Sequence, residues 1–180
     1  MKFRHLLVLF TVLSGASFPT YSDSEDTWDD ISNVGVYSLI GTALILPTVR
    51  DDWEGLRQAA YSIGSGAAIA LVGKTLIDEE RPDESGDDSF PSGHTTNAFS
   101  SATTLHRRYG WQIGVPAYAV ATLTGIGRER AREHHWYDVV AGAVIGTATG
   151  WFFTDPFDDQ VQLIPWADST GGGVTLSMRW

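Results

Sequence analysis

The 180-residue chain is long enough for one compact domain, and no shift of composition in its middle marks a second domain. Its formal net charge of -10 disfavours a nucleic-acid partner. The absence of cysteine excludes disulfide bonds and thiolate metal ligands, so the stability of the fold must come from packing. Acidic residues are concentrated in segments 23–30, 78–88 and 155–159, which we interpret as solvated loops.

The first 20 residues have the build of a secretory signal peptide, or of an N-terminal anchor that is not cleaved. Basic side chains at Lys2 and Arg4 precede an apolar run over residues 6–13, and small residues follow this run. A buried N-terminal helix is the alternative interpretation. We therefore expect export to the cell envelope, a leader over residues 1–20, a main domain over 21–157 and a tail over 158–180.

Five long runs lack Asp, Glu, Lys and Arg, although these four residue types make up 19% of the sequence. A helix in water normally shows charge every turn or two, whereas a helix surrounded by lipid or by other helices does not. The runs are 16 to 19 residues long, close to the roughly 20 residues that cross a bilayer core. Their many small residues suit close helix packing, either in a membrane, which we favour, or in a soluble bundle. The runs cover residues 31–49, 58–73, 89–106, 109–127 and 139–154.

These runs predict an all-α bundle with about five core helices. Pro47 and the Arg81-Pro82 pair are the expected stops of the first two helices, because proline cannot continue a helix. In the third helix, Pro91 suits a first-turn position and Ser92 can cap free amide groups. The helices are expected over residues 34–46, 53–78, from 91 onward, 111–130 and 136–153.

The end of the chain changes its hydrophobic period. Val174, Leu176 and Met178 alternate with polar residues, which is the spacing of a β-strand. The glycines that precede them are expected to form the turn of a hairpin. We therefore predict a short accessory β-hairpin within the tail.

Three cations, Lys74, Arg81 and Arg128, lie near the ends of the charge-free runs. If consecutive helices alternate in direction, these residues meet the start of the third helix at one mouth of the bundle. Guanidinium and ammonium groups donate charge-assisted hydrogen bonds to a tetrahedral oxyanion. Ser92 and Gly93 at a helix N-terminus add a hydroxyl and backbone amides, and glycine permits close approach. The set predicts a phosphate-binding cradle.

Two histidines and an aspartate supply the groups that a cradle lacks. His134 and Asp138 are four residues apart and are expected on one helix face, so the carboxylate can fix the tautomer of an imidazole that attacks phosphorus. His94 can protonate the leaving oxygen. Together they predict a double displacement through a phosphohistidine. A metal site built on these side chains is disfavoured, because the three nearby cations repel a divalent ion.

Three segments carry a resemblance to a known family: KTLIDEERP at 74–82, PSGH at 91–94 and RERAREHHWYD at 128–138. They resemble the three-part signature of the type 2 phosphatidic acid phosphatase (PAP2) superfamily, which also contains bacterial acid phosphatases and vanadium haloperoxidases. The resemblance implies a helical bundle of the PAP2/haloperoxidase type and a phosphatase that needs no cofactor and no metal. It implies phosphate binding by Lys74, Arg81, Ser92, Gly93 and Arg128, with His134 as the nucleophile, His94 as the general acid and Asp138 as the residue that orients His134.

Two departures from the family pattern stand out. Gly127 occupies the position before the third-motif arginine, where the family usually has serine, so a hydroxyl contact is either missing or supplied from elsewhere. The segment between Pro82 and Pro91 is also shorter than in many members, which leaves little room for a lid over the site. Neither departure removes a catalytic group.

We expect a membrane-embedded envelope phosphatase that hydrolyses phosphate mono- or diphosphate esters. The expected substrate is a phosphorylated lipid such as phosphatidic acid, phosphatidylglycerol phosphate or undecaprenyl diphosphate, or else a small phosphoester. The distribution of basic residues puts the motifs on the periplasmic side if the leader crosses first. Three alternatives stay open: a soluble periplasmic non-specific acid phosphatase, a vanadium-dependent haloperoxidase, and a non-catalytic protein that binds anionic headgroups.

Overall fold

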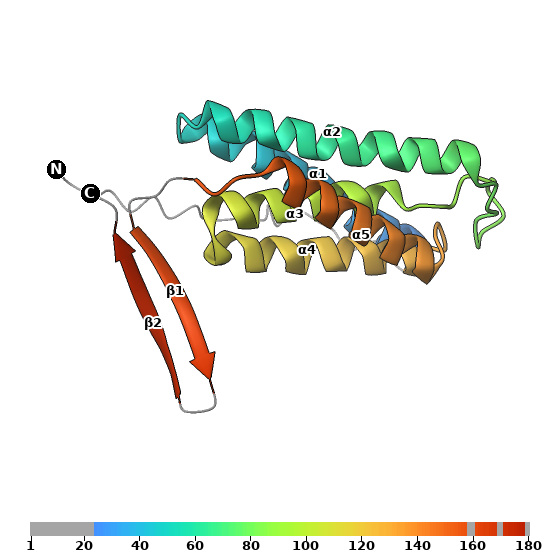
Figure 1. The fold of residues 1–180 in the computed structure, drawn as a ribbon. Helices are drawn as coiled ribbons and strands as arrows, with labels where there is room; N and C mark the ends of the chain where they lie inside the picture. Colours follow the sequence, from blue (N-terminus) through green and yellow to red (C-terminus); the bar gives the residue numbers. More distant parts are fainter. Residues whose placement is uncertain (1–23, 158–160, 169–170, 179–180) are drawn as a thin grey trace, which may run out of the picture.

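The structure is a computed structural model and describes residues 24–157, 161–168 and 171–178 (Figure 1). Over these residues the chain forms a helical bundle followed by a hairpin, which confirms the predicted fold class. The leader expected over residues 1–20 lies outside the described residues. The elements are α1 (Ser24–Val49), α2 (Trp53–Leu76), α3 (Gly93–Tyr109), α4 (Trp111–Arg130), α5 (Trp136–Phe153), β1 (Val161–Asp168) and β2 (Gly171–Met178).

Helix α3 lies at the centre of the bundle and packs against each of the other four helices. Its buried side chains are mostly small, as at Ala98. Helix α5 meets α3 with glycines four residues apart, at Gly142, Gly146 and Gly150. A Cβ on Gly146 would lie 2.2 Å from the carbonyl oxygen of Thr96, so only glycine permits this close approach. The small residues of the charge-free runs therefore serve contact between helices.

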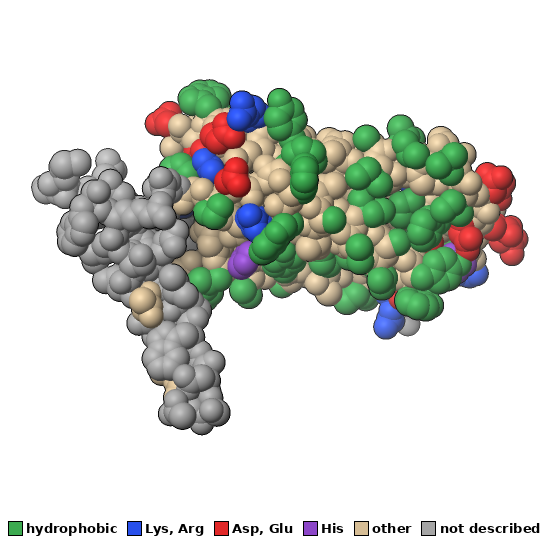
Figure 2. Space-filling view, viewed as in Figure 1, with side chains coloured by type: hydrophobic (Ala, Val, Ile, Leu, Met, Phe, Trp, Pro, Cys, Tyr) green, Lys and Arg blue, Asp and Glu red, His purple; other side chains and the backbone are tan. Residues whose placement is uncertain are grey.

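Large apolar side chains spread along the outer faces of the helices, and charged side chains gather mainly at the two ends of the bundle (Figure 2). An apolar surface of this extent is unusual for a protein surrounded by water. Within the described part of the chain, α1 is the one helix long and apolar enough to cross a membrane by length and composition. The exposed apolar residues include Val34, Ile45, Leu71, Val72, Val144, Trp151 and Phe152.

The boundaries of α1 and α2 differ from the predicted ones. Helix α1 begins at Ser24 instead of residue 34, and acidic residues occupy its first turn, where carboxylates interact favourably with the helix dipole. Pro47 does not end α1 but lies in its last turns, inside the helix. Helix α2 ends at Leu76 instead of residue 78, because Ile77 takes an extended conformation. Helices α4 and α5 have the predicted bounds.

The start of α3 confirms one expectation and corrects another. Ser92 is the N-cap, and its hydroxyl accepts a hydrogen bond from the amide of Thr95. Pro91 precedes the cap instead of occupying the first turn, so the helix begins at Gly93. The amide of Ser92 donates to the carbonyl of Asp138 at 3.1 Å, which ties the start of α3 to the start of α5.

The two strands pair in an antiparallel register that runs from Val161 opposite Met178 to Asp168 opposite Gly171. The predicted strand is therefore present as part of β2. The glycines at 171–173 lie inside β2 and do not form the turn, which corrects the expectation that they would.

Candidate active site

One end of the bundle gathers the residues of all three motifs. The end of α2, the start of α3, the end of α4 and the start of α5 meet there (Figure 1). The positive charges of the three predicted phosphate-binding cations act on both His94 and His134 and disfavour protonation of their rings. The structure therefore brings the three motifs to one end of the bundle, as the alternating directions of the helices predict. The residues at this end are Lys74, Arg81, Ser92, Gly93, His94, Arg128, His134 and Asp138.

Lys74 and Arg81 share one carboxylate, that of Asp88. Nε of Arg81 donates to Oδ1 of Asp88 at 2.8 Å, and Nζ of Lys74 lies 3.7 Å from Oδ2. Nζ of Lys74 also donates to the backbone carbonyl of Asp88. The hydrogen bond from Arg81 is the main cause that lowers the pKa of Asp88. Asp88 is exposed, as expected for a solvated segment, and it also pairs with two cations of the site.

Arg128 is the most enclosed of the three cations, with 4% of its surface exposed. One amino group lies 2.9 Å from Oε2 of Glu133, and the other pairs with Asp29 on α1. Ser32, also on α1, places its hydroxyl 3.4 Å from the second amino group. Nε of Arg128 has no hydrogen-bond partner among the described residues. A buried guanidinium N–H without a partner is available to an anion.

The first turn of α3 offers backbone to a ligand. Ser92 is buried, and its hydroxyl contacts that of Thr95 at 3.0 Å, so this hydroxyl serves the cap. A Cβ added to Gly93 would meet only Cε of Lys74, at 4.0 Å, so the space above the Gly93 backbone is open. Amide groups at a helix start carry no partner within the helix and favour anions. The backbone amide groups of this turn can therefore donate hydrogen bonds to an anion that the cations also bind.

His134 is almost fully buried and is held from one side by a serine. Its Nδ1 lies 3.4 Å from the hydroxyl of Ser89 and 3.8 Å from Oδ2 of Asp138. The Ser89 hydroxyl donates to the same Asp138 oxygen at 2.6 Å, so Ser89 stands between the carboxylate and the imidazole. Burial and the three nearby cations lower the pKa of His134 to about 3. The imidazole is therefore neutral near pH 7 and keeps a lone pair.

The placement of His134 corrects the expected helix face. His135 is the N-cap of α5, so His134 precedes the helix and does not share a helix face with Asp138. Asp138 instead accepts the amide of His135 at 2.8 Å and forms a capping box. Its carboxylate reaches His134 chiefly through Ser89. Ser89 was missed by the sequence analysis because it lies just before PSGH and follows no spacing rule.

His94 contacts α1. Nε2 of His94 lies 2.8 Å from Oδ1 of Asn33, and the ring of Tyr37 lies edge-on to the imidazole at 6.5 Å between centroids. Within the described residues, no three His, Asp or Glu side chains are arranged to hold a metal ion. The arrangement thus offers cations, amide donors and two imidazoles to a single tetrahedral anion.

The model of the PAP2 superfamily matches residues 55–160, which is more than half of the chain. The chain belongs to the PAP2 superfamily. Among curated PAP2-like relatives, a lipid A 1-phosphatase of Porphyromonas gingivalis is 35% identical over 119 residues, covering 59% of this chain and 26% of the relative. A lipid A 4'-phosphatase of Helicobacter pylori is 31% identical over 97 residues, covering 51% of this chain and 49% of the relative. The chain thus spans about a quarter to a half of the length of these two relatives.

Two solved structures share the PAP2 fold. The crystal structure of Aquifex aeolicus LpxE matches with a TM-score of 0.62 at 24% identity, covering 72% of this chain and 84% of that one. A transmembrane PAP2-type phosphatidylglycerolphosphate phosphatase from Bacillus subtilis matches with a TM-score of 0.57 at 23% identity, covering 72% and 74% of the two chains. At these identities the likeness concerns the fold.

Helix α1 ends before the PAP2 match begins, yet it lines the site. It supplies Asp29 and Ser32 to Arg128, and Asn33 to His94. The sequence analysis missed all three, because it treated residues 23–30 as a solvated loop and began the helix at residue 34. The only signal was their spacing, since residues three and four apart share one face of a helix.

The contact between α1 and α4 explains the glycine at position 127. A Cβ on Gly127 would lie 2.9 Å from Cβ of Ser32 and 3.0 Å from the carbonyl oxygen of Trp28. Glycine therefore lets α1 approach the end of α4. The approach brings the Ser32 hydroxyl to within 3.4 Å of the Arg128 guanidinium, so a hydroxyl contact to this arginine comes from another helix.

Proposed function

We propose that the chain is an envelope phosphatase that hydrolyses phosphate mono- or diphosphate esters of lipids. The observation that carries this proposal is the buried, neutral His134 beside three cations, at the mouth that also holds His94. A neutral imidazole is a competent nucleophile, and the cations stabilise charge on a transferred phosphoryl group. No residue of this set requires a metal ion or a cofactor.

In the first step, His134 attacks phosphorus through Nε2, because Nδ1 faces Ser89 and Asp138. A P–N bond forms and the P–O bond to the leaving group breaks. The leaving oxygen takes a proton from His94, so it departs as an alcohol, or as a phosphate when the substrate is a diphosphate. Arg128, Lys74 and Arg81 stabilise the charge on the equatorial phosphoryl oxygens.

In the second step, a water molecule attacks the phosphohistidine. His94, which lost its proton in the first step, accepts a proton from this water. The P–N bond breaks, inorganic phosphate forms and His134 regains its lone pair. Both steps use the same cradle, so one set of donors serves both transition states.

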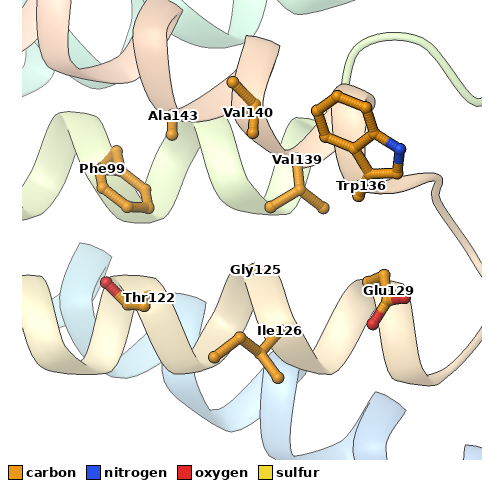
Figure 3. A pocket seen from close by; sticks show the side chains of 9 residues that line it. All are labelled: Phe99, Thr122, Gly125, Ile126, Glu129, Trp136, Val139, Val140 and Ala143. Atoms are coloured by element: carbon orange, nitrogen blue, oxygen red, sulfur yellow. The ribbon is translucent and has the colours of Figure 1, made fainter.

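An apolar groove beside the site supports a lipid substrate (Figure 3). It lies between α4 and α5 and has a volume of about 340 Å³. Figure 3 shows Trp136 and Val139 of α5 across from Gly125 and Ile126 of α4, with Glu129 near one end. Trp136 is two residues from His134, so this end of the groove adjoins the site. An acyl or prenyl chain fits such a groove better than a soluble alcohol does.

Two further observations support action at a membrane. Both curated relatives are named for phosphatase activity on lipid A, and the outer faces of the helices are apolar. We propose that the site faces the periplasm, as expected if the leader crosses first, so that Arg50 and Arg107 lie at the cytoplasmic end.

The test is phosphate release by the purified full chain from a panel of esters. The panel contains phosphatidic acid, phosphatidylglycerol phosphate, undecaprenyl diphosphate, a phosphorylated lipid A and a soluble alkyl phosphate. We expect wild type to release phosphate from at least one lipid, and His134→Ala to lose at least a thousandfold in kcat. His106→Gln, at the other end of α3, is the matched control and is expected to keep its activity.

The outcomes separate the candidate functions. Equal turnover of the soluble ester and the lipids would favour a non-specific acid phosphatase. Peroxide-dependent halogenation that needs added vanadate, without phosphate release, would indicate a haloperoxidase. Full activity of His134→Ala would rule out the proposed mechanism, and no turnover of any ester would leave a headgroup-binding protein.

A further inference from the structure

The contact between Asn33 and His94 has a defined direction. Oδ1 of Asn33 lies 2.8 Å from Nε2 of His94, and Nδ2 of Asn33 donates to Oδ2 of Asp29 at 2.9 Å. An ionised carboxylate only accepts hydrogen bonds, so Asp29 must face the amino group of the asparagine amide. The carbonyl oxygen of the amide then faces the imidazole. Nε2 of His94 therefore carries a proton and donates it to Asn33.

Asp29 is itself fixed, which makes the amide rigid. Its other oxygen pairs with the nearly buried Arg128. Asp29 and Asn33 are four residues apart and lie on one face of α1. A chain of contacts thus runs from the guanidinium of α4 through two side chains of α1 to the imidazole of α3.

We propose that Asn33 is a positioning residue of the reaction, which holds His94 in the orientation and tautomer that its acid and base roles require. This inference rests on the proposed function. With the Nε2 proton held by Asn33, Nδ1 of His94 is the nitrogen that exchanges protons. In the substrate complex the negative charge of the phosphate offsets the neighbouring cations, and His94 takes up a second proton, on Nδ1. In the first step this Nδ1–H protonates the leaving oxygen, and in the second step the free Nδ1 accepts a proton from water.

The charges around His94 explain why an uncharged acceptor is useful there. Burial disfavours the imidazolium, as do Arg128 from α4, Lys74 from α2 and Arg81 from the loop after α2, whereas Asp29 from α1 favours it. The Asn33 carbonyl favours a protonated Nε2 without adding a charge beside the phosphate. A carboxylate at position 33 would instead repel the negatively charged substrate.

The test compares two leaving groups in Asn33→Leu, which has similar volume but no acceptor. An alkyl ester needs a proton on its leaving oxygen, whereas the nitrophenolate of p-nitrophenyl phosphate leaves without one. Since kcat/KM reports the first step alone, we expect kcat/KM of Asn33→Leu to fall about 10- to 100-fold for a lipid phosphate and less than about threefold for p-nitrophenyl phosphate. The alkaline limb of the kcat/KM profile for the lipid phosphate should move to lower pH.

Two further variants complete the test. Asn33→Asp restores an acceptor, so its alkaline limb should move to higher pH than that of Asn33→Leu, and part of the loss of kcat/KM should be recovered. Ser38→Leu, an exposed position further along α1, is the matched control and should behave like wild type. If Asn33→Leu does not fold, Asn33→Ser, which shortens the side chain, undergoes the same comparison of leaving groups.

The result that overturns the inference differs from the result that overturns the function. An equal loss of kcat/KM for both leaving groups, or no loss for either, would show that Asn33 does not act through His94. Absence of turnover by wild type with every ester would instead remove the phosphatase itself.

Discussion

Restoring the serine that PAP2 members usually place before the third-motif arginine should harm this chain. In Gly127→Ser, the new Cβ would lie 2.9 Å from Cβ of Ser32 and 3.0 Å from the carbonyl oxygen of Trp28. Real Cβ atoms essentially never lie within 3.0 Å of another atom, as this one would of Ser32, and the tight second contact is to backbone, which cannot turn aside. Helix α1 must therefore move away from α4, or the end of α4 must bend.

The magnitude follows from the size of this overlap. Overpacking a well-packed contact costs about 1–3 kcal/mol, and serine regains about 0.5 kcal/mol over glycine in helix propensity. Each kcal/mol corresponds to about 2–4 °C in the midpoint of unfolding for a chain of this size. We expect Gly127→Ser to lower the thermal midpoint by a few degrees and to lower kcat, because α1 carries the partners of Arg128 and His94.

Thermal unfolding of the purified full chain in detergent, followed by tryptophan fluorescence, measures this effect. Gly41→Ala on α1 is the matched control, since a Cβ there meets nothing within 4 Å. This control should gain about 0.5–1 kcal/mol from helix propensity alone. The double variant Ser32→Gly/Gly127→Ser removes one of the two clashing atoms, so its loss should be smaller than the sum of the single losses. A gain in stability for Gly127→Ser that matches Gly41→Ala, without coupling to Ser32, would refute the close contact.

Two further predictions concern His134 and its partner Ser89. Ser89→Ala should lower kcat on a lipid phosphate about 10- to 100-fold, because the buried carboxylate of Asp138 loses its donor at 2.6 Å and the His134 imidazole loses its neighbouring hydroxyl. Ser89→Thr keeps a hydroxyl and should retain most of kcat, and equal kcat for Ser89→Ala and wild type would contradict this role. Between pH 6.5 and about 3 an unfolded chain protonates this histidine while the native state does not, so the free energy of unfolding should fall as pH falls through that window. Unfolding midpoints at pH 7, 5 and 4 should therefore drop more steeply for wild type than for His134→Asn, and parallel curves would show that the native imidazole takes up the proton.

The motif residues could be predicted from the sequence because their chemistry and spacing constrain each other. Three cations, two histidines and a helix start together suit the binding and cleavage of a phosphate ester. Helices that alternate in direction bring these residues to one end of the bundle. The bounds of α4 and α5 were also predictable, since Arg128 and Asp138 stand beside long charge-free runs.

The contribution of α1 could not be predicted in the same way. Asp29 and Ser32 meet Arg128 across about a hundred residues of chain, and no local pattern encodes such a contact. The acidic residues at 23–30 form the same sequence pattern in a solvated loop and in the first turns of a helix. The two structures differ in the packing of this segment against α4, which the local sequence does not encode.

The position of α1 changes what counts as the smallest functional piece of this chain. The family match starts at residue 55, so a fragment cut at that boundary would keep all three motifs and still expose Arg128 on the side that Asp29 and Ser32 now cover. A shortened protein for crystallisation, fusion or directed evolution should therefore begin no later than Ser24. Comparisons that align only the motif region will likewise omit the helix that supplies Asp29, Ser32 and Asn33 to the site.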